Sequence, residues 1–284
     1  MKRIIVFTFI IFIFISTSAF AKLRVTTTTF ILSDIVKQIG KDKITVSYLI
    51  PSGANPHIFS PKPRSLEKLI KSDIFIGVGF GFEFWFDKIR YLTKNRPVLF
   101  LSDYYKTPID LKVINSEKVA NPHIWLDINF IKDVAIFKIA DEFCRLDKSN
   151  CQFYKNNAKQ FQKRLKNLSS NYKQTFSSMK DFCFLDIKPA FEYMLRSFNV
   201  KSCSVLIKKG NREPKIRDIS CALGKCRCKK GAVLYINDKQ LAQMMASKLH
   251  YKQIELNPLG DPKVLRSYEI LMKHNLDCLQ KIVQ

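Results

Sequence analysis

Acidic residues and histidines are scarce in this sequence. Its 284 residues include 24 Asp and Glu against 48 Lys and Arg, a formal charge of +24, and only four histidines. A basic excess of this size often accompanies nucleic-acid binding, but here the basic residues are spread along the chain and no nucleic-acid motif accompanies them. We therefore expect a solvated basic surface and no nucleic-acid partner. The sequence also lacks a nucleophile motif and a partnered general base, which argues against an enzyme.

Only one long apolar run is present, and it lies at the amino terminus. Lys2 and Arg3 precede an almost entirely apolar stretch over 4–15, and residues 19–21 (AFA) form a small-any-small cleavage site. The run is too short to span a membrane comfortably, so a membrane anchor is the less favoured reading. No cysteine follows the run, so we expect no lipoprotein attachment point. The sequence predicts an exported protein, periplasmic or otherwise, that is soluble after cleavage and begins at Lys22.

The eight cysteines are an even number in a protein expected to be exported. Disulfides are therefore favoured over metal binding, although eight cysteines allow 105 pairings. Cys144 and Cys151 flank a short polar break and could staple it. Cys183 and Cys203 lie in consecutive strand-like segments and could pair across them. The other cysteines include a cluster before a later strand: Cys221, Cys226 and Cys228.

Strand-like segments alternate with helical ones in the first half, which predicts a parallel sheet covered on both faces. A helical region over 129–180 follows, broken near 147–150, and its second part, 152–179, contains no glycine or proline. The expected first-half strands are 23–28, 44–50, 74–78 and 98–101, with helices at 31–39, 65–70 and 84–92. After the long helix we expect strands at 182–187, 204–207, 233–236 and 253–256 and a final helix at 263–282.

The predicted fold is therefore α/β, with two parallel-sheet lobes joined by a long spine helix and a ligand cleft between the lobes. Ligands of such sheets bind beyond the carboxyl ends of the strands. The expected division is a signal peptide at 1–21, an N-terminal lobe at 22–148, the linking helix at 149–180 and a C-terminal lobe at 181–284.

Two of the four histidines lie in the same local sequence, Asn-Pro-His-Ile followed by an aromatic residue. These are His57, in a segment that follows the strand at 44–50, and His123. Proline fixes its own φ and restricts the residue before it, so each histidine is held in a stiff, non-helical turn. Because imidazole is the commonest metal ligand among side chains, the pair predicts half of a metal site at the binding edge of the sheet.

The sequence resembles the zinc/manganese-binding receptors of ABC importers over nearly all of its mature length. A lone Pro-His would be weak evidence, whereas this ordered set of motifs is specific. It comprises Val25-Thr26-Thr27, Asp34-Ile35-Val36, Ile39-Gly40, the stretch Ile50 to His57, a glycine-rich stretch with Gly79, Gly81, Glu83, Trp85, Asp87 and Lys88, the stretch Pro122 to Asp127, Tyr154, Asn157, Ala158 and Leu165 in the spine, Ala190-Phe191 with Tyr193, Leu256 with Pro258-Leu259-Gly260, and Tyr268, Met272 and Asn275.

The resemblance implies a monomeric receptor that binds one divalent metal ion between its lobes, Zn²⁺ in preference to Mn²⁺, and delivers it to the membrane permease of an ABC importer. In that family the first lobe supplies two histidines, at the positions of His57 and His123. The second lobe supplies a histidine or glutamate and often an aspartate. Here those two positions hold Lys188 and Asn257, and the histidine-rich loop of many zinc members is absent.

These departures leave alternatives open. A lysine at about 4 Å from a divalent ion repels it by up to roughly 8 kcal/mol at an effective dielectric of 20. Asp186 or Glu192 could replace the missing ligand, although a helical ion pair of Glu192 with Lys188 is favoured for the latter. Cysteine ligands are a further option, but Cys226 and Cys228 precede a strand and lie at the wrong edge of the sheet.

Two readings without a metal also remain. Lys188 could bind an anion, or pair with a carboxylate and hold the cleft shut. The alternative function is that of a degenerate relative. Such a protein has lost tight metal binding, carries no metal cofactor and serves as an accessory protein at the cell envelope. His250, at the end of a helical pattern, and His274, on the last helix, are expected at the surface rather than at the site.

Overall fold

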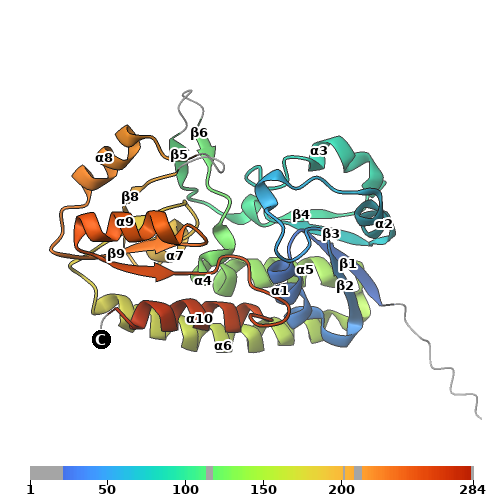
Figure 1. Cartoon of the computed structure of the whole chain (residues 1–284). Helices are drawn as coiled ribbons and strands as arrows, with labels where there is room; N and C mark the ends of the chain where they lie inside the picture. Colours follow the sequence, from blue (N-terminus) through green and yellow to red (C-terminus); the bar gives the residue numbers. More distant parts are fainter. Residues whose placement is uncertain (1–21, 113–117, 201, 208–212, 283–284) are drawn as a thin grey trace, which may run out of the picture.

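Two four-stranded parallel sheets form the centres of two lobes that share one long helix (Figure 1). The computed structural model describes residues 22–112, 118–200, 202–207 and 213–282. The predicted fold class is confirmed. The first sheet has the order β2-β1-β3-β4 and the second β10-β9-β7-β8. Their strands are β1 (Leu23–Thr27), β2 (Ile44–Tyr48), β3 (Ile74–Gly77), β4 (Val98–Phe100), β7 (Phe182–Asp186), β8 (Ser202–Val205), β9 (Lys230–Tyr235) and β10 (Lys252–Glu255).

Helices cover both faces of each sheet, which explains why the central strands are buried runs rather than alternating ones. All four residues of β3 and the last four of β7 are buried. In the first lobe, α1 (Phe30–Gly40) and α5 (Ile136–Leu146) pack on one face and α2 (Pro63–Lys71) and α3 (Phe86–Ile89) on the other. The second lobe packs α10 (Tyr268–Gln280) on one face and α8 (Ile216–Lys225) and α9 (Lys239–Leu249) on the other.

The spine is α6 (Cys151–Ser177), which has 27 residues and hence a length of about 40 Å. It lies beside α10 along one side of the molecule and passes beneath both lobes (Figure 1). Its buried face includes Tyr154, Phe161, Leu165 and Tyr172, which belong to one hydrophobic core together with residues of both sheets. The two lobes are therefore joined by a continuous core and not by a flexible connection.

Some elements differ from the sequence-based expectation. The final helix begins at Tyr268 rather than 263, because the Ser267 hydroxyl accepts from the amide of Ile270 and caps it. The helix expected over 84–92 continues after Ile89 as a 3₁₀ turn. A short antiparallel hairpin, β5 (Asp110–Lys112) with β6 (Lys118–Ala120), was not predicted. β6 leads directly into the second Asn-Pro-His segment, which is followed by α4 (Ile128–Phe130) and a π-helical turn at Ile131–Ala135.

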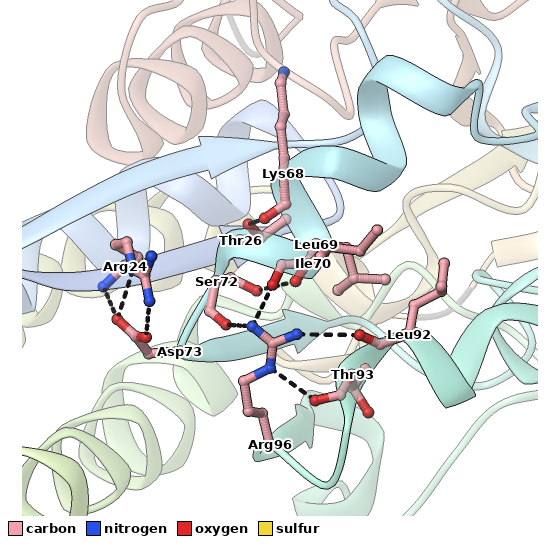
Figure 2. Close-up of polar contacts among 10 residues, drawn as sticks. All are labelled: Arg24, Thr26, Lys68, Leu69, Ile70, Ser72, Asp73, Leu92, Thr93 and Arg96. Carbon is pink, nitrogen blue, oxygen red and sulfur yellow. Dashed lines mark hydrogen bonds and ion pairs between the residues drawn. The ribbon is translucent and has the colours of Figure 1, made fainter.

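Basic side chains close the amino-terminal edge of the first sheet, opposite the edge where ligands bind. The Arg96 guanidinium donates to four backbone carbonyl oxygens, those of Ser72 (2.5 Å), Thr93 (2.7 Å), Leu92 (3.1 Å) and Ile70 (Figure 2). The Arg24 guanidinium donates to both carboxylate oxygens of Asp73. Part of the basic excess therefore satisfies backbone carbonyls at this edge and has a structural role.

The predicted signal peptide at 1–21 lies outside the described residues. Among the helices that are described, none is long and apolar enough to cross a bilayer. The residue boundaries predicted for the lobes stay a prediction.

Candidate metal site

The two Asn-Pro-His segments share one side-chain-to-backbone hydrogen bond. In each, the asparagine side-chain oxygen accepts from the backbone amide of the histidine two residues later, Asn55 from His57 and Asn121 from His123, both at 3.0 Å. Asparagine favours this local bond, and proline presets the φ between the two partners. The repeated sequence therefore gives the same asparagine–amide bond twice, although the 3₁₀ turn begins at Pro56 in the first segment and at Ile124 in the second.

His123 is held by a second contact that His57 does not have. Its Nδ1 lies 2.7 Å from the side-chain oxygen of Asn121. His123 as a residue is only 7% exposed. Because that oxygen only accepts, the proton sits on Nδ1 and the lone pair of Nε2 is left for a metal. Burial, together with the nearby His57 ring, lowers the pKa of His123 to about 3. The ring is therefore neutral, as a metal ligand must be.

His57 faces His123 across a short gap. The two ring centroids are 5.6 Å apart, and Phe82 contacts His57 edge-on at 6.0 Å. The residue is exposed as a whole, but these neighbours partly enclose its ring. This local burial and, secondly, the charge of Lys188 lower the pKa of His57. A zinc ion about 2.0–2.1 Å from one nitrogen of each ring lies roughly 3.2 Å from each centroid, so two rings at this separation can share one ion.

The loop that carries Phe82 is fixed by a buried glutamate. Glu83 accepts from the backbone amides of Val78 (2.8 Å) and Gly79 (2.9 Å) and from the hydroxyl of Thr28 (2.5 Å). Gly79 has φ +86°, and a Cβ there would meet the Ser102 side chain, so glycine is required. Glu83 therefore joins the loop after β1 to the loop after β3. The strand order of the first sheet changes direction between these two strands, and parallel sheets bind ligands at such a point.

In the second lobe, Lys188 forms an ion pair with Asp238 at 2.9 Å. The predicted helical pair of Lys188 with Glu192 is wrong, because α7 (Glu192–Arg196) begins at Glu192 and Lys188 precedes it. Asp238 was not among the residues predicted from the sequence. Its signal was its position: it follows the strand at 233–236, and β9 lies next to β7, so both residues emerge at the same edge.

Asn257 uses its side-chain oxygen within its own turn. That atom accepts from the amides of Leu259 (3.0 Å) and Gly260 (2.8 Å). Its backbone is also fixed, since Asn275 accepts from the amide of Asn257 and donates to its carbonyl. The amide oxygen is therefore committed to the backbone and is a poor metal ligand.

The two carboxylates considered as replacement ligands have other contacts. Glu192 accepts from Nδ2 of Asn121 at 3.1 Å, and the same Nδ2 donates to the carbonyl of Pro189 at 2.6 Å. Asp186 is fully buried, accepts from the Ser202 hydroxyl, and has a pKa raised well above its ordinary value by that burial. Within the described part of the chain, no group of three or more His, Cys, Asp and Glu could hold a metal ion. The structure thus brings together His57 and His123 alone.

The cysteines do not contribute to the site. The predicted Cys144–Cys151 bridge is confirmed, but the suggested Cys183–Cys203 pair is wrong. Cys183 pairs with Cys228 and Cys203 with Cys226, so the segment before β9 is tied to two strands of the same sheet. These bridges lie near the amino ends of those strands, away from the ligand edge. Cys221 and Cys278 are free.

The other two histidines lie outside the site. His250 is exposed and ends α9 in a left-handed conformation (φ 56°), as a C-cap. His274 is exposed on α10, with Nε2 3.7 Å from the sulfur of Cys278. Both positions agree with the sequence-based expectation.

Residues 25–282 match the family described as zinc-uptake complex component A, periplasmic. The chain belongs to this family. Its members are substrate-binding receptors of metal ABC transporters and not enzymes, which confirms the resemblance seen in the sequence.

Individual relatives and solved structures agree with this family. The chain is 26% identical to the manganese ABC transporter substrate-binding lipoprotein PsaA of Streptococcus mitis, covering 90% of this chain and 87% of that protein. It is 24% identical to the high-affinity zinc uptake system protein ZnuA of Bacillus subtilis, covering 91% and 87%. A manganese-bound periplasmic metal-binding protein from Candidatus Liberibacter asiaticus has the same fold, with a TM-score of 0.78, 21% identity and coverage of 93% and 100%.

Proposed function

We propose that this protein is an exported receptor that captures a divalent transition metal ion between His57 and His123 and delivers it to the membrane permease of an ABC importer. The observation that carries the proposal is the pair of imidazole rings, 5.6 Å apart, in which Asn121 fixes the proton of His123 on Nδ1. The family match over residues 25–282 supports the transport role.

Zinc is the proposed metal in preference to manganese. Imidazole nitrogen suits zinc, whereas manganese prefers carboxylate, carbonyl and water oxygens. The two proposed ligands are imidazoles, and among the described residues no carboxylate joins them in a group of three that could hold a metal ion. Relatives named for manganese and for zinc both match this chain, so the choice rests on the ligand chemistry.

Release is expected to involve local movement more than wide opening of the lobes. One core joins both lobes, and hydrogen bonds cross between them near the site. The Trp125 indole donates to the carbonyl of Pro258 (2.6 Å), and the Tyr193 hydroxyl donates to that of Asn121 (2.8 Å). The exposed turn around His57 has fewer such constraints, so we infer that it moves when the metal leaves.

Metal analysis and calorimetry on the protein starting at Lys22 test this function. We expect one zinc ion per chain, weaker binding of manganese, and loss of zinc binding in His57→Ala. His274→Ala removes an exposed histidine elsewhere and should bind zinc like the wild type. The proposal fails if zinc and manganese do not bind stoichiometrically, or if His57→Ala has no effect. A protein that gains zinc binding only as the Lys188→His, Asn257→Asp double variant would instead be the degenerate relative.

A further inference from the structure

Lys188 puts a positive charge at the position where a negatively charged ligand would complete a metal site. Lys188 and Asp238 follow β7 and β9, the neighbouring strands at which the order of the second sheet reverses. Ligands of parallel sheets bind at such a point. The lysine is therefore at the functional edge of the second lobe, as the two histidines are at that of the first.

Contacts across the lobes bring the segment that carries Lys188 against the first lobe beside His123. Pro189, the chain neighbour of Lys188, accepts, through its carbonyl oxygen, a hydrogen bond of 2.6 Å from the Asn121 amide, and Asn121 also contacts the His123 ring. The segment that carries Lys188 thus packs directly against Asn121, the residue that holds the His123 ring.

A lysine charge at this edge affects which form of the metal fits. A bare divalent ion about 4 Å from an ammonium group is repelled by up to roughly 8 kcal/mol at an effective dielectric of 20. The same ammonium attracts an anion. Two imidazoles also leave about two positions of a tetrahedral zinc ion open, which a small anion with two oxygens can fill.

We propose that the cargo is a metal ion carrying a small carboxylate-type anion, with His57 and His123 binding the metal and Lys188 binding the anion. This inference rests on the proposed metal-binding function. Bicarbonate and organic dicarboxylates share the required chemistry, namely two oxygens for the metal and a further oxygen for the lysine.

Asp238 holds the Lys188 side chain in place at this edge. The ammonium group has three donors, and its ion pair with Asp238 at 2.9 Å does not occupy all of them. The Lys188 side chain is 25% exposed, so its remaining donors are accessible. The pair also explains why a carboxylate and a lysine that are both partly buried occur together at this edge, since each offsets the burial of the other.

Zinc titrations with and without an anion test the proposal. The probes are zinc with chloride only, with bicarbonate and with malonate, at matched pH and ionic strength and with free zinc corrected for chelation by the anion. For the wild type we expect at least roughly tenfold tighter zinc binding with one of the two anions, about 1.4 kcal/mol. The anion that tightens zinc binding shows whether the bound anion is bicarbonate or a dicarboxylate.

Variants separate the lysine from general charge effects. Lys188→Met should lose the anion dependence, Lys188→Arg should keep it, and Lys230→Met, which removes an exposed charge at the opposite end of β9, should behave like the wild type. The Lys188→Met, Asp238→Asn double variant avoids an unpaired carboxylate and should also lose the dependence.

Two results separate this proposal from the function on which it rests. If the wild type binds zinc equally well in all three media, or if Lys188→Met binds zinc more tightly in the presence of anion, the anion proposal is wrong while zinc binding stands. If the wild type binds zinc in none of the media, both are wrong.

Discussion

The side chain of Asn121 contacts His123 on one side and the second lobe on the other. Its oxygen accepts from the ring and the backbone amide of His123 at 2.7 and 3.0 Å, and its Nδ2 donates to Glu192 and Pro189 at 3.1 and 2.6 Å. Asn55 forms only the backbone bond in the equivalent turn. The two segments therefore share the bond to the histidine amide and differ in how the ring is held.

This difference predicts unequal effects of two matched substitutions. Asn121→Ala and Asn55→Ala each remove the bond to the histidine amide, but only Asn121→Ala frees the ring. We expect Asn121→Ala to weaken zinc binding by about 10–100-fold, the usual range for a residue that orients a ligand, and Asn55→Ala by much less. Competition titrations with a zinc chelator measure both. Equal losses would show that the ring contact is unimportant.

The tautomer of His123 can be read independently of affinity. In the metal-free protein, ¹⁵N spectra should show the His123 proton on Nδ1. In Asn121→Ala, this ring should populate both tautomers, while the signals of His274 stay as they were. An Nε2-protonated ring in the wild type would contradict the assignment.

Stability should depend on pH through His123. Its pKa is lowered to about 3 in the folded protein, against about 6.5 in the unfolded chain. Between these values the unfolded state binds more protons, so stability falls as pH decreases from about 6.5 toward 3. At pH 4.5 the expected loss relative to pH 7 is about 2–3 kcal/mol for this group. Urea unfolding of metal-free wild type and His123→Asn at both pH values isolates it, since the variant should lose less.

A carboxylate at position 257 should strengthen the site. Asn257→Asp keeps an oxygen that can accept from Leu259 and Gly260, so the turn is expected to survive. The added negative charge should tighten zinc binding by roughly tenfold. Asn257→Ser, which adds no charge, serves as the control. If Asn257→Asp folds normally by circular dichroism and binds zinc no better, this edge does not face the metal.

The disulfides should differ in what they contribute. Cys183–Cys228 closes a separation of 45 residues and Cys144–Cys151 one of 7. Loop-closure entropy gives about 4 and about 2.5 kcal/mol respectively, so the Cys183→Ser, Cys228→Ser pair should destabilise more than the Cys144→Ser, Cys151→Ser pair. Peptide mapping under non-reducing conditions checks the connectivity, and thermal unfolding checks the order.

Local sequence predicted the elements whose signals are local. The Asn-Pro-His turns, the burial of β3 and the long α6 follow from proline chemistry, apolar runs and the lack of breakers. Lys188 was recognised as unusual, but its partner was not. The ion pair with Asp238 depends on β9 lying beside β7, and strand order is not a local property.

The same limit explains the incorrect disulfide and the missed hairpin. Cys183 and Cys203 lie in adjacent strands, yet the segment before β9 brings Cys228 and Cys226 to them instead. The strands β5 and β6 have three residues each, too few for a period-2 pattern to be recognised. The role of Asn121 likewise requires the second lobe to be in position.

Diffraction at the zinc absorption edge from crystals of the zinc-loaded protein tests the central claim most directly. We predict one anomalous peak between His57 and His123, about 2.0–2.1 Å from Nε2 of His123 and from one nitrogen of His57. A peak elsewhere on the chain, or no ordered zinc beside these two rings at full loading, would contradict the account.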